Sequence, residues 1–206
     1  MTRTVFITGF EPFGGESVNA SWEAVRLLPD ELSCWKILKE QLPVIYGMAG
    51  SRMLQAAESA DPGIIICTGV AAGRKEITPE MIAVNLRYAQ IADNSGFQPF
   101  FERIDPTGPD GIFSSLPVRE MAESVRQSGI QSNISFTAGT YVCNDLFYLL
   151  MRRCRDNILR GFIHVPSVGV LDPETCSKGL SLCILTAIQH AESKKREESA
   201  NAASPD

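Results

Sequence analysis

Short apolar segments alternate along the chain with longer segments whose apolar positions recur every three or four residues. The short segments predict strands, and the longer ones predict amphipathic helices. The expected strands are 4–8, 63–70, 134–139 and 161–166, with one or two more within 35–46. The expected helices are 19–32, 47–60, 116–129, 140–156 and 174–195. This alternation predicts a single α/β domain with a mostly parallel sheet covered by helices on both faces.

The middle of the chain, 71–113, breaks this alternation. It mixes short strand-like pieces with Gly, Pro, Asn and Asp turn signals, so we expect a hairpin and loops outside the main sheet. Such an excursion from a rigid scaffold often lines a functional site. The last residues, 196–206, are polar and rich in small side chains, and we expect this tail to be disordered.

Composition excludes several classes of partner. The net charge is −5, and no cluster of Lys and Arg precedes the tail, so we expect no nucleic-acid partner. No apolar run approaches the ~20 residues that span a bilayer, and the first residues lack the apolar region of a signal peptide. None of the six cysteines has C-x-x-C spacing, which argues against a zinc site. We therefore expect a cytoplasmic protein without a metal.

A glycine turn, TGFEPFGG, follows the first predicted strand at 8–15. Such a turn often binds phosphate, but this one carries Phe10 and Phe13 and no lysine. Aromatic faces suit a flat, uncharged ring better than an anion. One or both rings could instead fill the core.

Cys143 and His164 are the strongest candidates for chemistry. Cys143 falls in the first turn of a predicted helix, where the helix dipole and free N–H groups favour a thiolate. His164 lies near the end of the strand that follows, and the chain has only two histidines. A strand–helix–strand crossover would bring both residues to one sheet edge, although each alone could be a buried core residue. A third group should orient the histidine, and the candidates are Glu76, Glu80 and Asp93.

Four stretches, TGFEPFGG, GRKEITPEMIAVN, AGTYVCN and GFIHVP, together resemble the pyroglutamyl peptidase I family of cysteine peptidases. The resemblance implies a three-layer α/β/α sandwich with a mixed sheet, formed here by a peptidase domain at 1–195. It implies removal of an N-terminal pyroglutamyl (5-oxoproline) residue from peptides, without a cofactor, by a homo-oligomer (a tetramer or dimer). It makes Cys143 the nucleophile, His164 the general base and acid, and Glu80 the residue that orients it. The positions that match the family's ring-binding pocket are Phe10, Phe13, Ile91 and Val142.

The chain departs from the family at two positions. Gln90 stands where arginine is common near the oxyanion site, so either the backbone N–H of Cys143 would carry more of that role or Arg74 or Arg87 could substitute. Val70 replaces a frequent glutamine. Two alternatives to a peptidase use the same architecture. One is an enzyme resembling nucleoside phosphorylases, which would require phosphate, and the other is a non-catalytic binding protein.

Overall fold

The computed structural model describes residues 2–202 as one α/β domain with a six-stranded central sheet. The strands lie in the order β2-β3-β1-β4-β8-β5. Four of them are parallel: β3 (Trp35–Leu42), β1 (Thr4–Phe10), β4 (Ile64–Val70) and β8 (Leu159–Val165). The edge strands β2 (Glu31–Leu32) and β5 (Thr78–Pro79) are antiparallel to their neighbours. The predicted mixed, mostly parallel sheet is confirmed.

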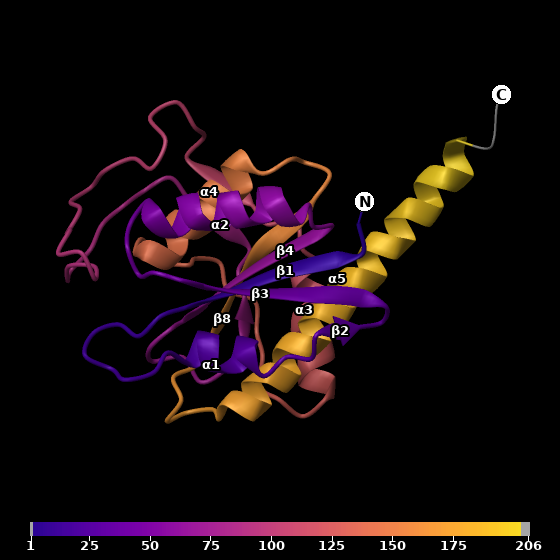
Figure 1. Ribbon diagram of the computed structural model, residues 1–206, viewed down its shortest axis with the longest axis horizontal. Helices are drawn as coiled ribbons and strands as arrows, with labels where there is room; N and C mark the ends of the chain where they lie inside the picture. Colours follow the sequence, from indigo (N-terminus) through magenta and orange to yellow (C-terminus); the bar gives the residue numbers. More distant parts are fainter. Residues whose placement is uncertain (1, 203–206) are drawn as a thin grey trace.

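Helices cover both faces of the sheet and complete three layers (Figure 1). One face packs against α1 (Ala20–Arg26), α3 (Val118–Gln127) and α5 (Pro173–Ala202). The other packs against α2 (Met48–Ala60) and α4 (Val142–Arg153). Both faces of β4 are buried, which explains its uninterrupted apolar sequence.

The excursion at 71–113 behaves largely as predicted. It contributes β5 to the sheet edge and then forms a separate hairpin from β6 (Ile82–Val84) and β7 (Gly111–Phe113). The segment between these two strands leaves the sheet on the side of α2 and α4 (Figure 1).

The predicted strand at 134–139 is wrong. Residues 131–135 run parallel to 77–81, but they form isolated bridges at Ser132 and Ser135 and no regular strand. Pro79 lies between the bridged positions and has no N–H to donate, so the ladder is interrupted there. Because β5 is antiparallel to β8, this segment is also not the parallel partner that a crossover to His164 would require.

The end of the chain differs from the composition-based prediction. The structure continues α5 through residues 196–202, whereas 203–206 lie outside the described residues. Glu, Lys, Arg and Ala, which dominate 191–200, have high helix propensity, and this accounts for the added turns. No helix among the described residues is long and apolar enough to cross a membrane.

Candidate active site

Cys143 lies in the first turn of α4, as predicted, and its sulfur sits against β4. A Cβ added to Gly69 would lie 2.7 Å from Cys143 Sγ, so only glycine leaves room for the thiol there. Gly69 is paired with His164 in the register of β4 and β8. The thiol therefore lies over the strand pair β4–β8, which carries His164. Cys143 comes near His164 because the start of α4 packs on β4, and not because a strand–helix–strand crossover joins two neighbouring parallel strands.

His164 and Glu80 form a buried pair beneath this position. His164 Nδ1 lies 2.7 Å from Glu80 Oε1, and both side chains are almost fully buried. A carboxylate only accepts hydrogen bonds, so Nδ1 carries the hydrogen and Nε2 is left as the basic nitrogen. His164 and Phe162 share the face of β8 that is turned toward α4, with ring centroids 4.8 Å apart. This packing holds the imidazole on the side of the sheet where Cys143 lies.

Arg74 anchors Glu80 from the excursion. Arg74 Nη1 donates to Glu80 Oε1 and to Thr78 Oγ1, each at 2.7 Å, and Nη2 donates to the carbonyl of Thr137 at 2.9 Å. The same carboxylate oxygen thus accepts from both His164 and Arg74. Glu80 Oε2 is buried and has no hydrogen-bond partner within the described part of the chain, so the orientation of the carboxylate rests on Oε1.

The other two candidate carboxylates do not reach the histidine. Asp93 binds the amides of Tyr46, Ser95 and Phe97. Burial opposes the charge on Asp93, but these hydrogen bonds and one from the Ser95 hydroxyl hold its pKa below the usual range. Glu76 is half-buried and is not a hydrogen-bond partner of His164.

The expected low pKa of Cys143 is wrong for the resting protein. Burial, followed by the negative charge of Glu80, raises the pKa of the thiol to about 12. The backbone N–H of Cys143 and the guanidinium of Arg74 act in the opposite direction but do not outweigh burial. Among the described residues, Cys143 and His164 form no hydrogen bond. At neutral pH the resting site therefore holds a neutral thiol beside the His164–Glu80 pair.

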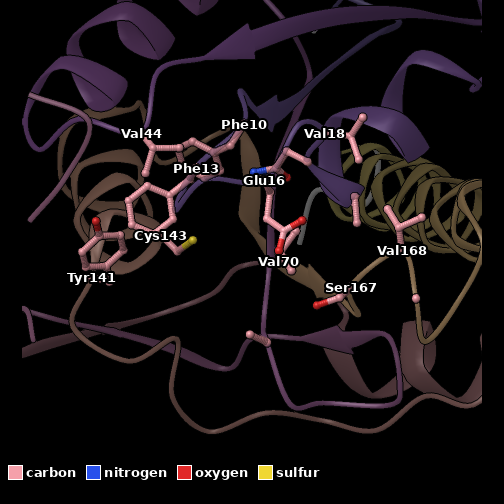
Figure 2. A pocket seen from close by; sticks show the side chains of 14 residues that line it. Phe10, Phe13, Glu16, Val18, Val44, Val70, Tyr141, Cys143, Ser167 and Val168 are labelled. Atoms are coloured by element: carbon pink, nitrogen blue, oxygen red, sulfur yellow. The ribbon is translucent and has the colours of Figure 1, made fainter. Parts of the chain in front are cut away.

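A cavity of about 410 Å³ opens beside the thiol. Cys143, Phe10, Phe13 and Tyr141 line it together with Val44 (Figure 2). The rings of Phe13 and Tyr141 pack with centroids 5.3 Å apart. The glycine turn thus places both of its phenylalanines next to the sulfur. Such walls suit a small, flat, uncharged group.

The other two positions expected to bind the ring lie elsewhere. Val142 is fully buried in the core between α4 and the sheet, and it does not line this cavity. Ile91 is 57% exposed and is also absent from the lining.

The two departures from the family pattern have different surroundings. Val70 lines the cavity. Gln90 is exposed. The two arginines that could replace an arginine at this position, Arg74 and Arg87, are each already paired with a carboxylate. Arg87 Nε donates to Asp145 Oδ1 at 2.6 Å, and Arg74 is engaged with Glu80.

Two further residues that the sequence analysis missed, Asn144 and Asp145, join the excursion to the first turn of α4. Asn144 bonds the N–H and C=O of Val84 and the carbonyl of Leu86. Asp145 accepts from Arg87 and from the amide of Gly47. Both side chains are fully buried. A usable signal was present: adjacent polar residues open a helix that is otherwise mostly apolar, directly after the cysteine.

Comparison with known proteins gives consistent matches. Residues 3–193 match the family model described as pyroglutamyl peptidase. The chain is 41% identical over 208 residues to the pyrrolidone-carboxylate peptidase of Bacillus subtilis, covering 95% of this chain and 97% of that protein. The corresponding Bacillus licheniformis protein is 44% identical, with coverage of 92% and 94%.

Solved structures agree with these matches. The crystal structure of pyroglutamyl peptidase I from Bacillus amyloliquefaciens superposes with a TM-score of 0.88 at 40% identity, covering 91% of this chain and 98% of that chain. A mutant pyrrolidone carboxyl peptidase from Pyrococcus furiosus gives a TM-score of 0.87 at 31% identity, with coverage of 91% and 99%.

Proposed function

The chain belongs to the pyroglutamyl peptidase family, and we propose that Cys143 carries its reaction, the removal of N-terminal pyroglutamate from peptides. The observation that carries this proposal is the position of the Cys143 thiol. It lies over Gly69, beside the His164–Glu80 pair, and opens onto an aromatic cavity. Nucleophile, base and orienting carboxylate are thus available at one end of the sheet.

In the proposed mechanism, His164 Nε2 takes the proton of Cys143 as the sulfur attacks the pyroglutamyl carbonyl. The imidazolium that forms is stabilised by Glu80, whose position is fixed by Arg74. His164 then gives the proton to the leaving amine as the C–N bond breaks. Water hydrolyses the remaining thioester and releases pyroglutamate. Because burial favours the neutral thiol, deprotonation is coupled to attack on the bound substrate.

The first turn of α4 supplies donors for the oxyanion. The first N–H groups of a helix have no intrahelical acceptor, and the N–H of Cys143 lies close enough to its own sulfur to lower the pKa of the thiol. With Arg87 held by Asp145, we propose that backbone N–H groups carry this role.

The pyroglutamyl ring is proposed to lie between the aromatic side chains of the cavity. Phe10 is the buried floor, and Phe13 is the partly exposed wall that packs against Tyr141. Ile91 and Val142 lie outside the lining, so we do not assign them a ring contact. The lining contains no Lys or Arg to hold a phosphate, which disfavours the phosphorylase alternative.

We propose residues 1–195 as the peptidase domain, since the family match spans 3–193 and the buried core extends to Ala191. A cytoplasmic location is proposed because all six cysteines are free, as expected in a reducing compartment.

We also propose that the protein is a homo-oligomer. Phe100 and Phe101 are 74% and 65% exposed and pack with Tyr88 in an aromatic cluster. In an extended strand, neighbouring side chains point to opposite faces. The backbone at Phe101 is not extended, since its φ is +52°, and the rings of Phe100 and Phe101 contact each other. An exposed cluster of this kind suits an interface. Light scattering should give a multiple of the chain mass for the wild type and a smaller mass for Phe100→Ser. A monomeric wild type would refute the proposal.

The proposed function is tested with a fluorogenic pyroglutamyl amide in phosphate-free buffer. The wild type should release the fluorophore, and Cys143→Ala should lose this activity while its circular dichroism spectrum is unchanged. Cys34→Ala, which removes an exposed cysteine outside the cavity, is the matched control and should stay active. Full activity in Cys143→Ala would overturn the proposal.

A further inference from the structure

The loop between β1 and α1 carries two carboxylates, and only one of them is used by the fold. Glu11 Oε1 accepts from the amide of Val44 at 3.3 Å and from Asn94 Nδ2 at 3.0 Å. Glu16 is exposed, and among the described residues its carboxylate has no hydrogen bond or ion pair. The loop thus presents one free negative charge.

This free charge faces the cavity of the candidate active site. Glu16 is among its lining residues and, of the residues that the structure describes, is the only Asp, Glu, Lys or Arg in the lining. Asn19 also lines the cavity and has a side-chain carbonyl oxygen, but its side chain is already hydrogen-bonded within the loop. Its amide donates to the carbonyl of Glu11, and its Oδ1 accepts from Ser21. A charged substrate group entering the cavity would therefore meet Glu16 alone.

The cavity has two chemically different ends (Figure 2). Phe10, Phe13 and Tyr141 gather with Cys143 at one end. Glu16 extends away from them, toward the end lined by Val168 and Ser167 of the β8–α5 loop. If the pyroglutamyl ring occupies the aromatic end and its carbonyl lies at the sulfur, the rest of the peptide must leave toward Glu16.

Resting on the proposed function, we propose that Glu16 selects the residue that follows pyroglutamate and favours a cationic side chain, lysine or arginine. The aliphatic stem of such a side chain would pack on Val18 and Val168, which are exposed at this end. Its charged head would pair with the free carboxylate. An acidic side chain at the same position would be repelled.

The expected size of the effect follows from the exposure of Glu16. A solvent-exposed ion pair contributes about 0.2–1 kcal/mol, which corresponds to a preference of up to about 5-fold in kcat/KM. The preference should shrink when salt shortens the screening length. It should appear in kcat/KM, because the leaving residue is present until the acyl-enzyme forms and is absent from thioester hydrolysis.

The test compares pyroglutamyl-lysine amide with pyroglutamyl-norleucine amide and pyroglutamyl-glutamate amide. These substrates share the ring and lack a terminal carboxylate, and the first two have similar stems. The wild type should prefer lysine over norleucine about 1.4- to 5-fold, and Glu16→Gln should bring this ratio close to one. Glu16→Lys should favour the glutamate substrate. Glu120→Gln removes an exposed carboxylate of α3 outside the cavity and should leave the ratio unchanged.

Each outcome decides the inference. Equal kcat/KM values for lysine and norleucine in the wild type, or an unchanged ratio in Glu16→Gln, would overturn it while leaving the peptidase assignment intact. Failure of the wild type to cleave any of the three amides would overturn the assignment and the inference together.

Discussion

Gly69→Ala tests whether the position of the Cys143 thiol determines activity, because its effect on kcat/KM can be compared with its effect on the stability of the fold. The added methyl would lie 2.7 Å from Cys143 Sγ and 3.0 Å from Phe162 Cζ. Ordinary carbon contacts are about 3.5–4.0 Å, so the sulfur must move by roughly 1 Å. A misplacement of that size costs about 10²-fold in rate. Crowding the core costs about 1–3 kcal/mol of unfolding free energy.

The assay measures kcat/KM for a fluorogenic pyroglutamyl amide and unfolding by urea on the same preparation. Gly50→Ala is the matched control, because the three atoms nearest to its methyl would all belong to the Leu149 side chain, and Gly50 lies outside the cavity lining. Gly50→Ala should change stability with little change in kcat/KM. If folded Gly69→Ala keeps wild-type kcat/KM, the thiol does not react from its place over Gly69, and the geometric account fails.

Three other changes have defined outcomes. Glu80→Gln should lower kcat by about 10³- to 10⁴-fold, because the imidazolium loses its counter-charge, whereas Glu76→Gln should change it little; the reverse order would move the orienting role to Glu76. Asn144→Ala should lower the unfolding free energy by about 2–4 kcal/mol in urea titrations, because three backbone groups lose their partner; a loss below about 0.5 kcal/mol would contradict this. Because burial raises the pKa of Cys143 to about 12, its thiolate is scarce at neutral pH, and its rate of alkylation by iodoacetamide should rise about tenfold per pH unit between about pH 7 and 10. A rate already constant at about pH 7 would show a preformed thiolate.

The layers and most elements of this fold could be predicted because they depend on local patterns. Continuous apolar segments gave β1, β4 and β8, and the position of Cys143 at the start of a helix followed from the strand-like and small residues before it. The strand expected at 134–139 failed for a non-local reason. Its apolar pattern is genuine, but its neighbour in space carries Pro79, which interrupts the hydrogen-bond ladder.

The candidate site was only partly accessible from sequence. The predicted elements made Cys143 and His164 candidates, and the motif resemblance selected Glu80, but the electrostatics of the thiol depends on burial, which the helix-dipole argument did not include. The sequence also does not show which way a side chain near the site points. Val142 is buried in the core and Ile91 is exposed to solvent. The sequence does not show that, among the described residues, the Glu16 carboxylate lacks a hydrogen-bond partner while Glu11 and Asn19 of the same loop have partners; this requires the structure.

The most direct test of the central claim, that Cys143 attacks the pyroglutamyl carbonyl, is covalent labelling with the chloromethyl ketone of pyroglutamate followed by peptide mapping. We predict that inactivation parallels the labelling of one residue, Cys143, and that a pyroglutamyl amide substrate slows both. Inactivation with the label on another of the six cysteines, or labelling of Cys143 without loss of activity, would contradict the account.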